Sequence, residues 1–106
     1  MVKKVLVAAG FVENKTFRET RFLKPPKSTY AVFLRSFTRR GADGLNLLNE
    51  CANTIELYSY VKDPEAEARI EKALDDLGLE YDKADCYWIH EEQLYQVIYT
   101  FTTFEK

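Results

Sequence analysis

The residues of this 106-residue chain best suited to acid–base or metal chemistry are a single histidine and two pairs of adjacent carboxylates. His90 is followed directly by Glu91 and Glu92, and Asp75 lies next to Asp76. Metal sites combine several His, Cys or carboxylate ligands, whereas no second histidine and no nearby cysteine accompanies His90 in the sequence. The carboxylate pairs fall where a turn and a helix surface are expected. We therefore predict no metal site and interpret both pairs as solvated.

Two cysteines, Cys51 and Cys86, are the remaining reactive side chains. They form no CxxC pair and no disulfide-framework spacing, so we expect two free, buried thiols. Nucleophilic catalysis needs an activated Ser or Cys beside a base, and the chain has no GxSxG and no paired Cys/His signature. Its four glycines form neither a phosphate-binding loop nor a dinucleotide fingerprint. The sequence thus predicts no catalytic set and no cofactor, and we expect that the protein is not an enzyme.

The elements that position these side chains are organised around one helix. Asp63 is suited to accept hydrogen bonds from the free N–H groups of a first turn, and Pro64 has no N–H to lose there. Gly78 offers the left-handed conformation that ends a helix at little steric cost. We predict a helix over residues 64–77, with one side packed on a sheet. Its apolar residues at helical spacing are Ala66, Ile70, Ala73, Leu74 and Leu77.

Strands are predicted on both sides of this helix. Residues 55–61, 80–89 and 94–104 are rich in β-branched and aromatic side chains, and residues 90–93 form the turn between the last two. A hairpin is antiparallel, whereas strands joined across a helix can be parallel, so we expect a mixed sheet. An alternating stripe on the last strand favours core or interface over a stacking platform for nucleic-acid bases. Its members are Tyr95, Val97, Tyr99 and Phe101.

The first half carries weaker patterns. Residues 2–9 place apolar side chains on one helical face before Gly10, with a short strand at 5–8 as the competing interpretation. Residues 17–22 fit an edge strand, and residues 29–38 fit a central strand because apolar side chains fill both of its faces.

Residues 41–44, Gly-Ala-Asp-Gly, indicate a turn or a mobile loop, and residues 45–53 fit either a hairpin arm or a helical turn. The whole pattern predicts a single α+β domain over residues 1–106. It has a mixed, mainly antiparallel sheet of four to five strands, one principal helix (64–77) packed on one face, and a short N-terminal helix.

Composition agrees with one folded domain. The chain is 46% hydrophobic, with seven Tyr and seven Phe, which is typical of a packed, sheet-rich protein and excludes a disordered one. No apolar run approaches the ~20 residues of a membrane span, and residues 1–10 lack the cleavage region of a signal peptide. We expect a soluble, intracellular protein.

Charge differs in sign between the two halves. Residues 1–53 hold ten Lys/Arg against four Asp/Glu, and residues 54–106 hold five against thirteen. Arg35, Arg39 and Arg40 form the clearest basic cluster. Such asymmetry is typical of nucleic-acid contact or of complementary contact between subunits. The third interpretation is that both halves neutralise each other within one domain.

Several short motifs resemble a family of small phage and prophage proteins encoded beside tail genes. They are similar to the tail terminator, or tail completion, proteins of long-tailed phages. The likeness covers about the last fifty residues, while residues 10–21 depart from the family pattern. The motifs are Ile55–Tyr58 (IELY), Lys62–Glu65 (KDPE), Tyr81–Lys83 (YDK) and Glu92–Tyr99 (EQLYQVIY), with Pro25-Pro26, Tyr30–Phe33 and Gly41–Asp43 upstream.

The resemblance implies an α+β fold and a hexameric ring that caps the finished tail tube and receives the head connector. Its partners would be further copies of the chain, the tail-tube protein and the head–tail connector protein, in the virion or in the host bacterial cytoplasm during assembly. No membrane partner is implied, and DNA would be met only as it passes through the ring. The alternatives are a head-completion or neck protein, a small ligand-binding regulatory domain, and nucleic-acid binding through the basic half.

A closed ring joins two different surfaces of neighbouring subunits, so a basic surface facing an acidic one is a natural pairing. We therefore expect the arginines and the adjoining loop to contact the second half of a neighbouring subunit, or the tail tube. The candidate interface residues are Arg35, Arg39, Arg40, Gly41, Asp43 and Gly44.

Overall fold

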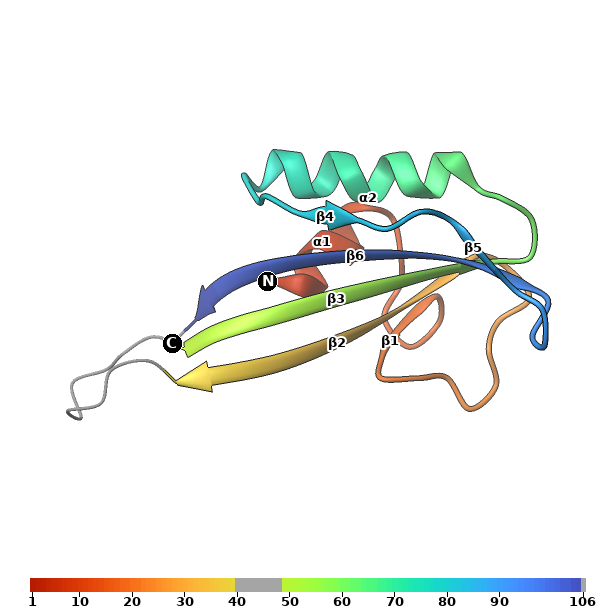
Figure 1. Ribbon diagram of the computed structural model, residues 1–106, viewed down its shortest axis with the longest axis horizontal. Helices are drawn as coiled ribbons and strands as arrows, with labels where there is room; N and C mark the ends of the chain where they lie inside the picture. Colours follow the sequence, from red (N-terminus) through yellow and green to blue (C-terminus); the bar gives the residue numbers. More distant parts are fainter. Residues whose placement is uncertain (40–48, 106) are drawn as a thin grey trace.

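The computed structural model describes residues 1–39 and 49–105. Within these ranges the chain forms an α+β fold in which two helices pack on one face of a six-stranded sheet (Figure 1). The strand order is β1-β2-β3-β6-β4, with β5 also paired to β6, and all described pairs except β1/β2 are antiparallel. The elements are α1 (Val2–Ala8), β1 (Phe17–Glu19), β2 (Tyr30–Arg39), β3 (Asn49–Ser59), α2 (Pro64–Asp76), β4 (Asp82–Lys83), β5 (Tyr87–Ile89) and β6 (Leu94–Glu105).

The sheet has more strands than the four to five predicted because the expected strand over residues 80–89 is divided in two. Lys83 of β4 pairs with Tyr99, whereas Tyr87 of β5 pairs with Gln96. The outer segment therefore uses one residue more than β6 over this interval, as at a β-bulge. The extra residue interrupts the ladder and leaves two short strands in place of one.

The two cysteines are free, as predicted, but they differ in exposure. Cys51 is buried on β3, whereas Cys86 is exposed between β4 and β5. The prediction of a buried thiol is therefore wrong for Cys86, because the bulged segment lies at the sheet edge.

Helix α2 begins as its sequence predicts. The Asp63 carboxylate accepts a 3.1 Å hydrogen bond from the Ala66 N–H, and Pro64 is the first helical residue. The second carboxylate oxygen of Asp63 accepts a 2.7 Å hydrogen bond from the Thr29 hydroxyl. The Thr29 bond lowers the pKa of Asp63, and the Ala66 N–H lowers it further against the opposing effect of burial. The helix start is thus also fixed to the segment that precedes β2.

The end of α2 corrects the predicted helix face. The Leu79 N–H donates to the Leu74 C=O at 2.9 Å across Gly78, whose φ is +70°, which is the geometry of a Schellman cap. This cap brings Leu79 onto the core beside Leu74. Leu77, expected to pack on the sheet, is instead 38% exposed.

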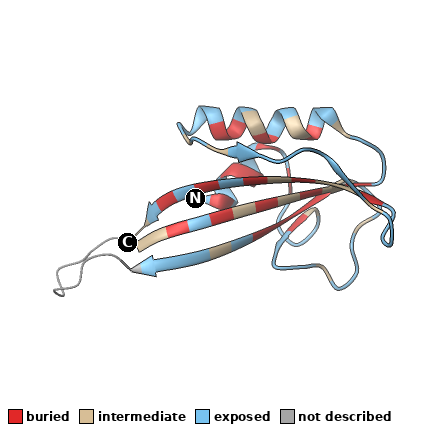
Figure 2. Cartoon of the chain, viewed as in Figure 1, coloured by how far each residue is buried: buried red, intermediate tan, exposed pale blue. Residues whose placement is uncertain are grey.

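Helix α1 confirms the N-terminal helix, one residue shorter than predicted. Val2, Val5 and Leu6 are buried, and the chain leaves the helix at Gly10 with φ +95°. The Arg69 Nε–H donates to the Ala9 C=O at 2.9 Å and joins α1 to α2. Both helices share one apolar core with alternate residues of the sheet, and buried positions therefore alternate along β3 and β6 (Figure 2).

Long strands form the spine of the sheet. The predicted central strand 29–38 is Tyr30–Arg39, and the last strand is Leu94–Glu105. Strand β3 begins at Asn49, before the predicted strand 55–61, so residues 49–53 belong to a hairpin arm. It stops at Ser59, and Tyr60 and Val61 are exposed. Residues 41–44 and 45–48 lie outside the described ranges.

The sheet face without helices carries a small second apolar cluster at one end. Tyr30 and Tyr58 stack with ring centroids 5.2 Å apart, and Phe22 meets Tyr30 edge-on. Strand β1 is the predicted edge strand, but it covers Phe17–Glu19 only. The chain after it brings Phe22 across to this second face.

Candidate subunit interface

Strand β2 has a free edge over its second half. Strand β1 ends at Glu19, opposite Phe33, and among the described residues no other strand pairs with this side of β2. The Thr20 N–H donates to the Phe33 C=O at 2.9 Å, so Phe33 turns its backbone groups toward this edge. Backbone groups alternate in direction along a strand. The residues that continue the free edge are therefore Arg35, Phe37 and Arg39.

Strand β6 has a free edge on the opposite side of the sheet. Its pairing with β4 ends at Asp82 opposite Thr100, and beyond this point only β3 pairs with β6 in the described ranges. The Ala84 N–H donates to the Ile98 C=O at 2.9 Å, so even-numbered residues turn their backbone groups outward here. The residues that continue this free edge are Thr102 and Phe104.

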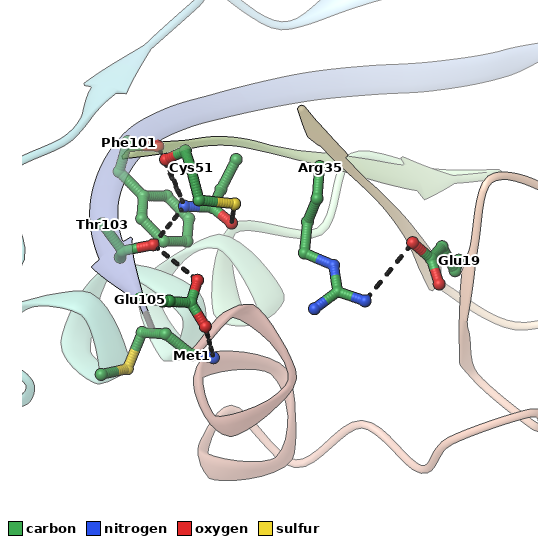
Figure 3. Close-up of polar contacts among 8 residues, drawn as sticks. Met1, Glu19, Arg35, Cys51, Phe101, Thr103 and Glu105 are labelled. Atoms are coloured by element: carbon green, nitrogen blue, oxygen red, sulfur yellow. Dashed lines mark hydrogen bonds and ion pairs between the residues drawn. The ribbon is translucent and has the colours of Figure 1, made fainter. Parts of the chain in front are cut away.

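Arg35 is the one predicted interface residue whose side chain the structure describes. Its Nη2 lies 3.5 Å from a carboxylate oxygen of Glu19 (Figure 3). Its guanidinium carbon lies 5.5 and 5.9 Å from the ring centroids of Phe33 and Phe37. Its Nε is buried without a hydrogen-bond partner among the described residues. The arginine thus contacts its own subunit through a long, half-exposed ion pair, which contributes little stability.

The other predicted interface residues are only partly placed. Arg39 is the last residue of β2 and pairs with Asn49. Arg40, Gly41, Asp43 and Gly44 lie outside the described ranges.

Asn53 organises the buried end of the sheet beside Arg35, a role that the sequence did not predict. Its Nδ2 donates to the Cys51 and Phe101 carbonyls at 3.2 and 3.3 Å and to the Thr103 hydroxyl at 3.0 Å (Figure 3). The Cys51 thiol donates to Asn53 Oδ1 at 3.3 Å, and burial raises the pKa of that thiol. A polar residue alternating with Cys51 and Ile55 on the core side of a strand is the signal that marks Asn53.

Glu105 extends this polar cluster to the start of the chain. The Thr103 hydroxyl donates to its carboxylate at 2.9 Å, and the Met1 amino group lies 3.5 Å from the other carboxylate oxygen (Figure 3). The hydrogen bond from Thr103 holds the pKa of Glu105 below its ordinary value. The cluster therefore fastens the end of β6 to α1 and keeps this part of β6 in place although β4 no longer covers it.

An open cavity of about 810 Å³ lies where β4 leaves β6. Its walls include Thr100, Phe101 and Thr102 of β6, together with the C-terminal end of α2 and the segment that follows it. Three acidic residues, Asp75, Glu80 and Asp82, are among those that line it, and none of the described lining residues is basic. The free edge of β6 is thus bordered by negative charge, whereas the free edge of β2 carries arginines.

The other chemical candidates remain apart. His90, Glu91 and Glu92 are exposed, and within the described ranges no group of three His, Cys, Asp or Glu side chains is arranged to hold a metal ion. In the other carboxylate pair, Oδ2 of Asp76 lies 2.8 Å from the Lys72 ammonium, and Asp75 lines the cavity.

The aromatic stripe of the last strand is core. Val97, Tyr99 and Phe101 are buried under the helices, and Tyr95 packs against Trp88 with ring centroids 4.7 Å apart. Of the two predicted alternatives, core or interface, the structure confirms core for Val97, Tyr99 and Phe101, which leaves them unavailable for stacking on bases. Neither described helix is long and apolar enough to cross a membrane.

No protein-family model matches the chain, and no curated protein sequence matches it significantly.

Proposed function

We propose that this protein is a structural protein of a phage or prophage virion, a tail terminator that forms a ring on the tail tube and joins the tail to the head. The observation that carries the proposal is the pair of free strand edges on opposite sides of one sheet, one carrying arginines and the other bordered by carboxylates. A closed ring needs two different, complementary surfaces on each subunit.

Two further observations support the proposal. The α+β fold, with two helices on one face of the sheet, agrees with the fold that the sequence motifs imply. The motif residues Ile55 and Leu57 lie in the core of β3, and Asp63 and Pro64 form the start of α2. The motifs thus specify the scaffold and leave the strand edges for contact with partners.

The test is deletion of the gene from a phage or prophage genome that carries it. If the ring caps the finished tail tube, we expect its loss to leave filled heads unjoined to tails of irregular length, and purified protein added to the lysate should restore joining. Infectious particles in normal yield would contradict a virion role. Heads that lose their DNA beside tails of regular length would assign the protein to head completion instead.

A further inference from the structure

We infer that copies of this chain join edge to edge into one continuous sheet, with β2 of one subunit pairing in parallel with β6 of the next. This inference deepens the proposed function: it rests on the ring and identifies the surfaces that form it. The partner of each free edge is therefore a second copy of the chain.

Strand direction fixes the parallel arrangement. Both β2 and β6 run antiparallel to β3, so they run parallel to each other within a subunit. Rotation about a ring axis along the strands preserves that direction, and β2 then meets the neighbour's β6 in parallel.

The backbone groups also match. In a parallel pair, every second residue of each strand points its N–H and C=O at the partner strand. Such a residue lies opposite a residue whose backbone groups point away, and it bonds to the two residues on either side of that one. The backbone N–H and C=O of Phe37 point outward from β2. Phe37 lies in one row of the sheet with Thr103, because both pair with Cys51 of β3. The residues on either side of Thr103, Thr102 and Phe104, point their backbone groups outward from β6. Phe37 of one copy opposite Thr103 of the next therefore satisfies both strands and keeps all helices on one face.

Exposed apolar side chains lie along both edges. Phe37 is 52% exposed on β2, and Phe104 is 57% exposed on β6. A long unpaired edge with exposed aromatic residues promotes association with another strand unless it is covered. Pairing of the two edges satisfies their unpaired backbone groups and partly covers Phe37 and Phe104, which lie on opposite faces of the sheet.

Charge selects the order of the two edges. Arg35 lies on the helix side of β2, and in the same row the neighbour's edge presents Phe101, which lines the acidic cavity. Paired strands lie about 4.8 Å apart, which is within the length of an arginine side chain. Across the junction, Arg35 therefore faces the part of this cavity lined by Asp75 and Glu80, whereas two β6 edges would bring two acidic cavities together.

Disulfide trapping tests this pairing in the full chain, with Cys51→Ala and Cys86→Ser as the background. Ser36 and Thr102 are exposed, share one row on the helix-free face, and are separated within a subunit by Ala52 of β3. Two strand spacings, roughly 9.5 Å, exceed the reach of a disulfide. The pair Ser36→Cys with Thr102→Cys can therefore crosslink only between subunits.

We expect this pair, or a pair shifted by two residues along β6 with Thr100→Cys or Phe104→Cys, to crosslink at least about tenfold faster than a control pair. The control joins Ser28→Cys, an exposed loop position, with Thr102→Cys. Equal rates for all pairs would overturn the inference. Dimers formed as fast by Ser36→Cys alone would also overturn it, because they would show β2 pairing with itself.

The crosslinked products separate this inference from the proposed function. Each subunit carries one cysteine on either edge, so a closed ring gives a ladder of bands that ends at its subunit number, and an open filament gives a ladder without an end. A ladder without an end would support the edge pairing and contradict the tail-terminator ring. A hexamer in native mass spectrometry without preferential crosslinking would support the ring and overturn the edge pairing.

Discussion

The Tyr99 hydroxyl donates a 2.8 Å hydrogen bond to the Glu71 carboxylate and so joins the last strand to helix α2. Lys83 of β4 completes the contact, with its ammonium 2.8 Å from Glu71 and 2.9 Å from Glu67. This junction lies next to the acidic cavity and holds α2 against the edge where β4 leaves β6. Burial raises the pKa of Glu71, but the hydrogen bonds from Lys83 and Tyr99 outweigh it and leave that pKa below its ordinary value of 4.5.

Stability should therefore depend on acid through Glu71. A carboxyl whose folded-state pKa is lowered stabilises the fold above its ordinary pKa and loses that contribution as pH falls through the folded-state value. We expect Glu71→Gln to lower the free energy of unfolding at pH 7 and to shrink the loss between pH 5 and pH 3. Urea unfolding at each pH measures both effects, with the exposed Glu80→Gln as control. If the unfolding free energy of Glu71→Gln fell with pH as it does in the unmodified protein, Glu71 would not be the source of the acid dependence.

The corrected face of α2 predicts opposite results for two leucines one helical turn apart. Leu74 is fully buried, so Leu74→Ala should cost about 2–5 kcal/mol as a large-to-small core change. Leu77 is 38% exposed, so Leu77→Ala should cost less than about 1 kcal/mol. Thermal and urea unfolding of both variants gives the comparison. Equal losses of unfolding free energy in the two variants would show that Leu77 belongs to the core.

The start of α2 predicts a graded response at Asp63. Replacement by Ala removes the cap on the Ala66 N–H and should cost roughly 0.5–2 kcal/mol, with a further loss from the Thr29 hydrogen bond. Asp63→Asn keeps an oxygen that can accept the Ala66 N–H and should recover most of the stability. The midpoints of urea unfolding test this order, and a neutral Asp63→Ala variant would contradict the cap.

Proline substitutions on β2 distinguish residues whose N–H points to the free edge from residues whose N–H bonds to β3. Phe37 turns its N–H outward, and proline is tolerated in a strand where the N–H faces solvent. Phe37→Pro should therefore leave the subunit folded but prevent its assembly, whereas Phe37→Ala should weaken assembly less. Ser36→Pro removes a ladder bond to β3 and should destabilise the subunit itself. Circular dichroism reports folding and native mass spectrometry reports assembly; rings formed normally by Phe37→Pro would contradict the free edge as a contact.

Charge reversal tests Arg39, the last residue of β2, together with Arg40, which follows it in the sequence. The double variant Arg39→Glu with Arg40→Glu should remain folded yet fail to form or join rings in solution without DNA, because we expect the two arginines to contact acidic residues of a neighbouring subunit. Salt alone does not discriminate, since exposed ion pairs and DNA contacts are both screened beyond about 10 Å at 0.1 M. Normal assembly without DNA, with tail joining intact, would leave these arginines as DNA-facing or solvated.

The sequence by itself determined the local elements of this protein. Asp63, Pro64 and Gly78 act on the backbone within a few residues, so the limits of α2 follow from residue chemistry alone. The alternation of Val97, Tyr99 and Phe101 likewise identified the core face of β6, because side chains alternate between the two faces of a strand.

Only the tertiary structure decided features that depend on distant pairing. The division of the strand over 80–89 arises because this segment has one residue more than the part of β6 with which it pairs. A local sequence pattern does not show how many residues the partner strand has over the same interval. The free edges of β2 and β6 depend in the same way on where β1 and β4 stop. Asn53 appeared in the sequence as one polar residue at the end of a segment that fitted either a hairpin arm or a helical turn, and its role depends on Thr103, fifty residues away.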